Sequence, residues 1–507
     1  MPYQPAAVSN RSVNASRHSS VPITREQQSA LGQFLTASHV ADLMVSFSQT
    51  RYRNIELLDP GAGDGALTAA FVRRLCEKRQ KPLSVRVTAY ELDSVLLPQL
   101  QTTLDVCKKR CEQAGIQFST RIVNEDFISS VIPVIRNELF APQLPSFNVA
   151  IVNPPYGKIR SDSPARRMLR LVGVETNNIY AGFLALITKL LTNGGELIAI
   201  TPRSFCNGPY FKPFRLEFLD AMSLRRLHVF ESRSAAFRRD QVLQENIIVH
   251  AVKSARKPDR VTVSMSSGEP GSSAKQHRIS YDNVVTRNGA DRIIHVTTDK
   301  IQTKAKAIIE QLSCSLVDLG LKVSTGRVVD FRARRYLYRE PNHATVPLIY
   351  PAHFCGFHIE WPKPQFRKPN AILCTEDTKD LLLPADIYVL VKRFTSKEER
   401  RRVSAAIYDP EIVQASFVGF ENHLNYFHIN GEGLSRNLAR GLTAYLNSTV
   451  LDQYFRQFSG HTQVNATDLR AMKYPARKSL ETLGLLMAKC EMTQHELDLA
   501  VSKELFT

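Results

Sequence analysis

The feature that most constrains this chain is a regular alternation of short apolar runs and amphipathic helical segments between Thr24 and Val252. Apolar runs such as VRVTAY (85–90) and VAIV (149–152) have the length of strands, whereas ALTAAFVRRLCEKR (66–79) repeats apolar residues at helical spacing. Strands that alternate with helices of this length form a parallel sheet with helices on both faces. We therefore expect an α/β fold for this part of the chain.

A second domain is expected because 507 residues are too many for one core of ordinary size. A polar stretch rich in Pro, Gly and Ser at 253–278 interrupts the alternation and marks the expected boundary. The expected divisions are a flexible tail over 1–22, an α/β domain over 23–255 and a separate α+β domain over 256–507. In the last of these we expect strands around 346–354 and 385–394, and helices around 435–455 and 479–505.

Charge and cysteine content narrow the classes of function. The 66 Lys and Arg outnumber the 48 Asp and Glu, for a net charge of +18, which favours a polyanionic partner over a merely basic surface. The eight cysteines include no C-x-x-C pair, so neither a disulfide framework nor a metal site is expected. The sequence has no signal-peptide core and no apolar run of about 18 residues, which predicts a cytoplasmic protein without a membrane span.

A glycine-rich segment, LLDPGAGDG (57–65), follows the first expected strand and precedes a helix. Glycines let the backbone approach a ligand closely, and the start of the helix supplies free N–H groups. The segment does not read G-x-G-x-x-G, and its two aspartates would repel a pyrophosphate but suit a ligand that carries an amino acid and a sulfonium. The alternative is a plain turn. The expected ligand-binding residues are Asp59, Pro60, Gly61, Gly63 and Gly65.

The next two strands also end in acidic residues. Glu91 stands where a carboxylate accepts hydrogen bonds from both hydroxyls of a ribose. Asp126 could accept from an adenine amine while Phe127 covers the face of the ring. The alternative for this pair is a helix-capping Asp beside a core Phe.

The fourth strand, VAIV, is stopped by Asn153, Pro154, Pro155 and Tyr156. Two prolines fix φ and carry no N–H, so the Asn153 side chain and the Pro154 carbonyl are presented as acceptors at the edge of the sheet. This arrangement suits an amino group on an aromatic ring, and Tyr156 could stack on that ring. An ordinary turn with a surface tyrosine is the alternative when the four residues are considered alone.

In their order, these motifs resemble those of the amino-methyltransferases of restriction-modification systems, specifically the adenine-N6 enzymes of the gamma arrangement. The match runs from about Gln33 to Val249 and includes LGQFLTASHVADLM (31–44). The resemblance implies a Rossmann-like sheet that binds S-adenosyl-L-methionine, with Thr36 contacting its methionine part. It also implies that the four residues from Asn153 to Tyr156 are catalytic and act on an adenine flipped out of double-stranded DNA.

A second aromatic closes over the flipped base in enzymes of this family, shortly before a late strand. In SRSAAFRRDQVLQENIIVHAV (232–252), Phe237 has that place. Phe230 is the competing residue, but it follows LHV and is expected to lie inside a strand. Phe237 is therefore the expected partner of Tyr156.

The resemblance implies that the second domain recognises the DNA target. An arginine- and tyrosine-rich segment, GRVVDFRARRYLYRE (326–340), is suited to phosphates and guanine edges, whereas KEERRR (397–402) is more typical of solvated charge. SGHTQVNATDLRAMKYP (459–475) resembles a segment near the nucleic acid, with helix capping as the alternative. The expected DNA-binding residues are Arg327, Arg332, Arg334, Arg335, Tyr336, His461, Gln463 and Asn465.

The C-terminal segments are most similar to those of the BsuBI and PstI type of type II modification methylases. This likeness implies the target CTGCAG, a bacterial cytoplasmic location and a functionally paired restriction endonuclease that need not be bound. We expect a monomer, because one strand can be methylated per visit. Three alternatives remain: a methyltransferase acting on a protein glutamine, one acting on RNA, and an inactive DNA-binding specificity protein.

Overall fold

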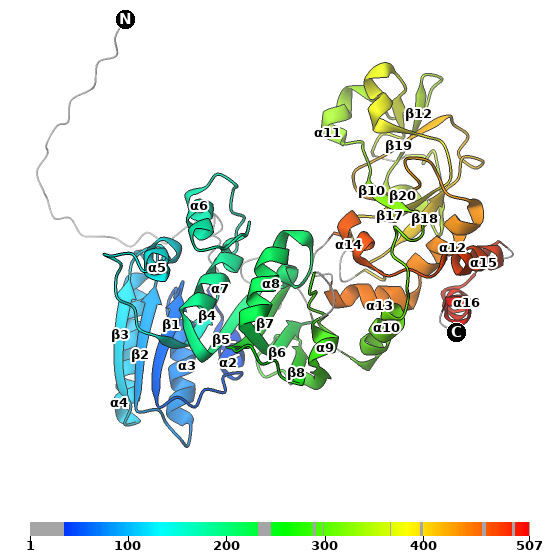
Figure 1. Cartoon of the computed structure of the whole chain (residues 1–507). Helices are drawn as coiled ribbons and strands as arrows, with labels where there is room; N and C mark the ends of the chain where they lie inside the picture. The colour runs from blue at the N-terminus through cyan, green and yellow to red at the C-terminus, as the bar shows by residue number, and fades with distance from the viewer. Residues whose placement is uncertain are drawn as a thin grey trace, which may run out of the picture.

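The computed structural model describes residues 35–231, 245–286, 291–297, 299–365, 367–395, 399–458, 463–488 and 492–505. Two parts lie side by side: one large sheet with helices on both faces, and a second part built from two smaller sheets and a group of helices (Figure 1). The expected tail over 1–22 lies outside the described residues.

The large sheet has nine strands in the order β3-β2-β1-β4-β5-β7-β6-β8-β9. The first five run parallel, β7 is antiparallel to both neighbours, and β9 is antiparallel to β8. In spatial order the strands are β3 (Gln117–Val123), β2 (Ser84–Tyr90), β1 (Asn54–Pro60), β4 (Phe147–Val152), β5 (Leu191–Pro202), β7 (Asn246–Lys253), β6 (Met222–Phe230), β8 (Arg260–Ser266) and β9 (Lys275–Ser280).

Helices cover both faces of this sheet, as the alternating pattern predicts. One face carries α2 (Ser38–Val45), α3 (Ala66–Glu77) and α4 (Leu97–Gln113), which share one apolar core. The other face carries α5 (Phe127–Ile135), α6 (Pro164–Leu171), α7 (Ile179–Leu190) and α8 (Lys212–Ala221) around a second core. β4 is nearly completely buried because both cores press on it. Its last residue, Val152, therefore delivers the following loop at a rigid sheet edge.

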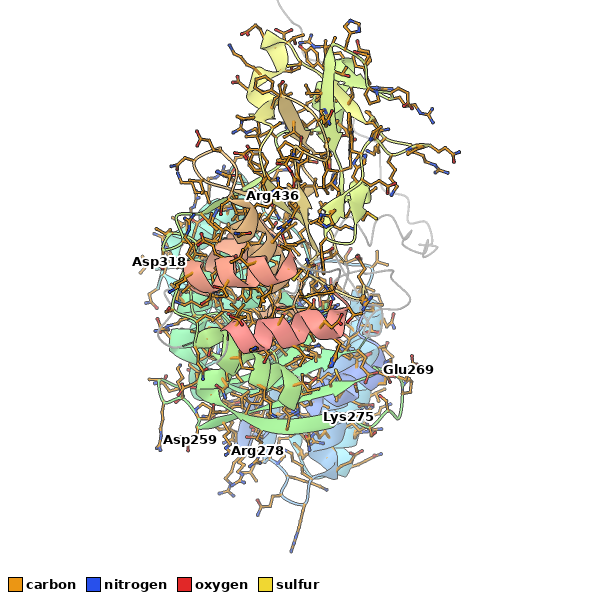
Figure 2. The ribbon with its side chains drawn as sticks, turned by 90° about the vertical axis from the view of Figure 1, so that its right-hand side faces the viewer. Asp259, Glu269, Lys275, Arg278, Asp318 and Arg436 are labelled. Atoms are coloured by element: carbon orange, nitrogen blue, oxygen red, sulfur yellow. The ribbon has the colours of Figure 1, made fainter. Side chains whose placement is uncertain are left out.

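The sheet continues past the expected boundary at residue 255. β8 pairs with β6, and β9 pairs with β8, so both strands extend the first part (Figure 2 shows Lys275 and Arg278 on β9). The polar stretch at 253–278 was expected to be a linker, yet Val261 and Val263 alternate with polar residues and are fully buried. A strand with one covered face needs only such a two-residue alternation, which a polar composition conceals. We place the division of the chain after α9 (Tyr281–Val284) instead.

The second part is α+β. Its six-stranded sheet contains β10 (Lys322–Thr325), β20 (Leu424–His428), β17 (Tyr388–Lys392), β18 (Ala405–Tyr408), β14 (His358–Ile359) and β13 (Phe354–Cys355). Its five-stranded sheet contains β11 (Leu337–Tyr338), β15 (Ala371–Leu373), β12 (Thr345–Ile349), β19 (Phe417–Phe420) and β16 (Leu382–Pro384). The expected strands around 346–354 and 385–394 correspond to β12 and β17.

Helices of the second part pack mainly against the six-stranded sheet. The two helical regions expected from the sequence, around 435–455 and 479–505, each consist of two separate helices. The helices of eight or more residues are α10 (Lys300–Glu310), α12 (Arg436–Leu446), α13 (Thr449–Phe458), α15 (Arg477–Met487) and α16 (Gln494–Leu505). Shorter helices are α11 (Asp330–Ala333) and α14 (Ala466–Ala471). Within the described residues, no helix is both long and apolar enough to cross a membrane.

A buried arginine joins the two parts of the molecule. Arg203 directly follows β5, and its side chain is 5% exposed. Its Nη1 lies 3.1 Å from Glu245 Oε1, while its Nη2 donates to the carbonyls of Arg456, at 3.0 Å, and of Gln457 near the end of α13. A planar guanidinium can satisfy these acceptors together, and a lysine cannot.

We expect Arg203→Lys to lower the free energy of unfolding by about 1.5–3 kcal/mol, because at least one charge-assisted hydrogen bond is lost in a buried site. Chemical unfolding followed by circular dichroism measures the change. The control is Arg86→Lys, since Arg86 is largely exposed and pairs with Glu56 at the surface. That change is expected to leave the free energy of unfolding nearly unchanged, because water screens an exposed ion pair. Equal effects at both positions would contradict the joining role of Arg203.

Candidate active site

The glycine-rich loop bends sharply over the carboxyl end of β1. Gly61 and Gly63 have φ values of +79° and +58°, which favour glycine. The N–H groups of Gly61 and Ala62 both donate to the Tyr90 carbonyl at 2.8 Å, which ties the loop to the end of β2. Gly65 also has positive φ and is the N-cap directly before α3, while Pro60 is the last residue of β1. The expected cofactor residues of this loop therefore lie together at one sheet edge.

Asp59 lies beneath this loop and is fully buried. Thr68 Oγ1 donates to Asp59 Oδ2 at 2.6 Å, whereas the buried Oδ1 has no hydrogen-bond partner among the described residues. Burial raises the pKa of the Asp59 carboxyl to about 7, and the nearby Glu91 and Asp64 add to the increase. A buried oxygen without a donor is suited to accept from a ligand, and a cationic amino group would restore the ionised form.

Glu91 follows β2 and faces the same loop. Its Oε2 accepts from the Gly63 N–H at 2.8 Å, and its Oε1 accepts from the Asp93 N–H at 2.7 Å. Burial is the main cause that raises the pKa of Glu91. The expected ribose-binding residue therefore also holds the glycine-rich loop in place.

Asp126 and Phe127 occupy the alternative roles considered for them. Asp126 is the N-cap of α5, and its side chain accepts from the Ser129 N–H at 2.8 Å. Phe127 is 2% exposed, and its ring lies 4.9 Å from that of Phe183 and 5.2 Å from that of Tyr90. Capping and core packing explain both residues, so their contact with a cofactor adenine stays a prediction.

The loop from Asn153 to Tyr156 directly follows β4 and faces the glycine-rich loop. A Cβ placed on Gly61 would lie 3.9 Å from the Asn153 carbonyl oxygen and 4.0 Å from Pro155 Cδ. A larger side chain at position 61 would fill the space between the two loops. Asn153 Nδ2 also donates to Thr36 Oγ1 at 3.1 Å, which orients the amide. Segments that are far apart in the sequence thus meet at one point.

Tyr156 is wedged between the two cores of the first part. Its hydroxyl donates to the Ile200 carbonyl at 3.4 Å, and its ring lies edge-on to Tyr180 with centroids 6.4 Å apart. Burial raises the pKa of the Tyr156 phenol well above its usual value, so the hydroxyl stays protonated. The side chain is therefore suited to stacking rather than to acting as a base.

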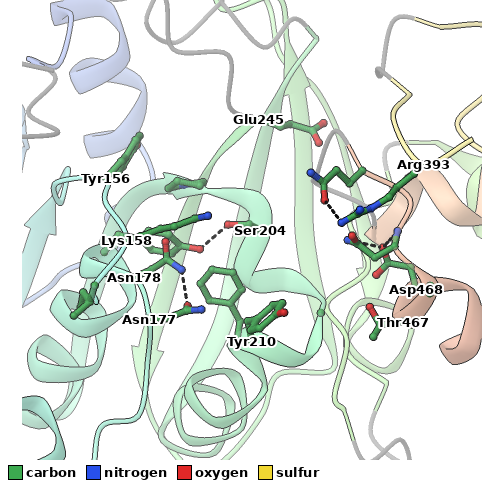
Figure 3. Close-up of a pocket in the computed structure, with 18 of the residues that line it drawn as sticks. Tyr156, Lys158, Asn177, Asn178, Ser204, Tyr210, Glu245, Arg393, Thr467 and Asp468 are labelled. Carbon is green, nitrogen blue, oxygen red and sulfur yellow. Dashed lines mark hydrogen bonds between the residues drawn. The ribbon is translucent and has the colours of Figure 1, made fainter. Parts of the chain in front are cut away.

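A cavity of about 920 Å³ opens in front of Tyr156, between the two parts of the molecule. In Figure 3, Tyr156, Lys158, Asn177 and Ser204 lie on one side of it, and Arg393 lies on the other. Its basic lining residues are Lys158, Arg393, Arg402 and Arg470. Basic side chains around the Tyr156 ring favour an anionic, aromatic ligand such as a nucleotide.

Two of the expected DNA-binding residues line this cavity. Gln463 Oε1 accepts from Arg393 Nη2 at 3.5 Å, and Asn465 caps α14 through a reciprocal pairing with Asp468. Asn465 therefore has the capping role considered as its alternative and also faces the cavity. His461, in the same segment, lies outside the described residues.

The arginine-rich segment does not contribute to the cavity. Arg327 donates to the carbonyls of Asp380 and Leu382, and the Tyr336 hydroxyl donates to Asp377. The remaining expected DNA-binding residues of this segment are exposed: Arg332, Arg334 and Arg335. They stay predicted DNA contacts on a surface separate from the cavity lining.

The structure does not place the second aromatic residue that is expected to close over the flipped base together with Tyr156. Phe237 lies outside the described residues. Its competitor Phe230 ends β6, is 2% exposed and packs edge-on against His228 with centroids 5.0 Å apart. A ring buried in this way is part of the core, as expected for a residue inside a strand.

Sequence reasoning missed most of the cavity lining. Lys158 follows the Asn153–Tyr156 loop directly, so its proximity to the motif could have identified it. No local signal marks the other residues, because they come from separate segments of both parts and are far apart along the chain. The missed polar and aromatic lining residues include Asn177, Asn178, Ser204, Tyr210, Arg393, Arg402 and Arg470.

Comparisons with known proteins agree with these features. A family model described as Eco57I restriction-modification methylase matches residues 102–237. The chain is 44% identical over 478 residues to the type II methyltransferase M.PstI of Providencia stuartii, covering 94% of this chain and 93% of the relative. It is 43% identical over 478 residues to the type II methyltransferase M.BsuBI of Bacillus subtilis, covering 93% of each.

Similarity to solved structures is weaker. The cryo-EM structure of a DrdV–DNA complex is 12% identical, with a TM-score of 0.46, and the match covers 91% of this chain and 57% of that chain.

Proposed function

Because the chain belongs to the type II methyltransferases of restriction-modification systems, we propose that it methylates N6 of an adenine flipped out of double-stranded DNA. The cofactor is S-adenosyl-L-methionine, which supplies a methyl group on a sulfonium when bound. The residues at the sheet edge would then hold the cofactor. The cavity would hold the base.

The residues at the sheet edge fit this cofactor. The unpartnered Oδ1 of Asp59 would accept from its amino group, and Glu91 would accept from its ribose hydroxyls. Because Gly61 has no side chain, the glycine-rich loop and the Asn153 loop can lie close together. Thr36, beside Asn153, would contact the methionine part.

The catalytic step would depend on hydrogen bonding and positioning. The Asn153 amide oxygen and the Pro154 carbonyl would accept the two N–H protons of the adenine amine. This draws the nitrogen toward tetrahedral geometry and localises its lone pair, which makes the nitrogen a better nucleophile. Tyr156 would stack on the base and hold the amine in line, and the proton leaves after transfer.

The observation that carries this proposal is the meeting of the Asn153 loop with the glycine-rich loop at the mouth of a basic cavity. A protein glutamine has a planar amide that the same acceptors could hold, but it has no charge for four basic lining residues to bind. Structural RNA remains the second candidate substrate, because its phosphates and bases would suit the same lining.

We also propose that the target is CTGCAG, that the protein acts as a monomer, and that it is paired with a restriction endonuclease it need not bind. The likeness of the C-terminal segments to the BsuBI and PstI type supports the target. The basic second part supports recognition of the flanking bases.

Purified protein is expected to transfer labelled methyl from S-adenosyl-L-methionine to duplex DNA. Digestion of the product to nucleosides should give N6-methyl-2′-deoxyadenosine as the labelled nucleoside. Plasmid sites with the sequence CTGCAG should become resistant to an endonuclease that cleaves them. Label found only in RNA or protein would contradict the proposed substrate, and protection of a different sequence would contradict the proposed target.

A further inference from the structure

Tyr210 is a large aromatic side chain that the core does not use. It is 75% exposed, lies in the short turn Pro209–Phe211 and lines the cavity between the two parts (Figure 3). The surrounding lining combines basic residues such as Lys158 and Arg393 with other aromatic rings, and the Tyr210 ring nevertheless stays exposed to the cavity. An exposed aromatic in such a place is typical of a binding surface.

The turn that presents Tyr210 is held rigidly from behind. Arg215 is 1% exposed, and its Nη1 donates to the carbonyls of Phe205 and Gly208 at 3.2 Å. Its Nε donates to the Asp291 carbonyl at 2.8 Å. Burying a guanidinium is unfavourable unless it is fully hydrogen-bonded, so this arrangement keeps the turn in one conformation.

Tyr210 also stands beside a row of aromatic rings that ends at the catalytic loop. Its neighbour Phe211 stacks on Tyr180 with centroids 5.6 Å apart, and Tyr180 lies edge-on to Tyr156. The Tyr180 hydroxyl is bonded to Ser204 at 2.7 Å. The packed row fixes the position of Tyr210 relative to Tyr156, while leaving the Tyr210 ring itself exposed.

We propose that Tyr210 enters the DNA duplex and fills the space that the flipped adenine leaves. This inference rests on the proposed function. Flipping a base removes its stacking on both neighbours, and an aromatic ring in the vacated space restores part of that stacking. Lys158 and Arg393 lie on the same cavity, where they can bind the phosphates of the strand that holds the ring in place.

The test compares the unchanged full-length protein with its Tyr210→Ala variant. Both are assayed on two unmethylated duplexes that contain the target site. In one the target adenine is paired with thymine, and in the other it lies opposite an abasic position. Tyr210→Ala is expected to lower kcat/KM about tenfold to a hundredfold on the paired duplex. The loss should fall below about threefold on the second duplex, because the adenine there leaves the helix easily. A merely structural role would lower activity equally on both.

Two further variants serve as controls. Tyr210→Phe keeps the ring and should behave as the unchanged protein on both duplexes. Phe140→Ala removes an even more exposed aromatic, 94% exposed, that does not line the cavity, and should have no effect. A 2-aminopurine at the target position should show weaker fluorescence enhancement with Tyr210→Ala than with the unchanged protein.

Equal losses on the two duplexes, or no loss on either, would overturn the inference. Either outcome counts against the inference only when the unchanged protein methylates the paired duplex. Absence of any DNA methylation by the unchanged protein would instead contradict the proposed function, so the two failures are distinguishable.

Discussion

Asn153→Ala is expected to lower the rate of methyl transfer at saturating DNA by about a hundredfold to a thousandfold. The variant loses the side-chain acceptor for one N–H of the target amine, and a positioned hydrogen-bonding group of this kind typically accounts for a factor of about 10²–10³. It also loses the bond to Thr36 that orients the loop. Single-turnover transfer of labelled methyl measures the change.

Cofactor binding should survive this substitution, because Asp59 lies on β1 and Glu91 follows β2, whereas Asn153 follows β4. Calorimetric titration with S-adenosylhomocysteine is expected to give an affinity within about threefold of the unchanged protein. Asn148→Ala is the matched control: Asn148 lies on β4, which leads into the Asn153 loop, but its side chain bonds to the Glu56 N–H and the Asn54 carbonyl away from that loop. If Asn148→Ala lost as much transfer as Asn153→Ala, the role of Asn153 would be structural and not catalytic.

Asp59→Asn is expected to separate stability from cofactor binding. At pH 8 the variant should unfold at a higher temperature than the unchanged protein when no cofactor is present, yet bind the cofactor about a hundredfold less tightly. The buried carboxylate is unfavourable without a ligand, and an amide avoids that charge. The loss of affinity follows from losing a charge-assisted hydrogen bond to the amino group.

The direction of the pH dependence follows from the raised pKa of Asp59. In the cofactor-free protein this pKa is about 7, whereas the ordinary value is 3.8. The folded state therefore keeps a proton that the unfolded state releases, and this contribution to stability is complete below pH 3.8. It is lost as the pH rises through about 7, by up to about 4 kcal/mol. Asp59→Asn should remove this dependence.

Thermal unfolding at pH 6, 7 and 8 measures the stability, and calorimetry at the same pH values measures cofactor affinity. The affinity of the unchanged protein should rise with pH through about 7, since ionised Asp59 binds the amino group. Asp64→Asn serves as the control in the same loop, where Asp64 accepts from the Ala66 N–H. A variant at position 59 that is less stable at pH 8 and binds the cofactor normally would contradict both expectations.

Much of the site could be predicted because its signals are local. The positive φ of Gly61 and Gly63 and the pair of prolines after Asn153 are properties of a few adjacent residues. An acidic residue at the end of a buried strand can likewise be recognised from the sequence. Their meeting at one edge follows from a parallel sheet, in which the carboxyl ends of β1, β2 and β4 lie side by side.

Other predictions depended on contacts that no short segment reveals. Asp126 is a helix cap beside a core phenylalanine, and the sequence permits this role and a cofactor contact equally. The boundary after residue 255 was wrong because β8 and β9 pair with a distant edge of the sheet. The arginine-rich segment and the Gln463 segment look similarly suited to DNA, but only the second lines the cavity.

The amino-acid sequence by itself determined the α/β architecture of the first part, the glycine-rich loop and the four residues from Asn153 to Tyr156. These depend on periodicity, on proline and glycine stereochemistry and on strand ends, which act over a few residues. Only the tertiary structure decided which side chains line the cavity that we propose receives the target base. The cavity forms where Lys158 and Tyr210 of one part face Arg393 and Gln463 of the other. Such a surface is set by long-range packing, because its residues are close in space and far apart along the chain.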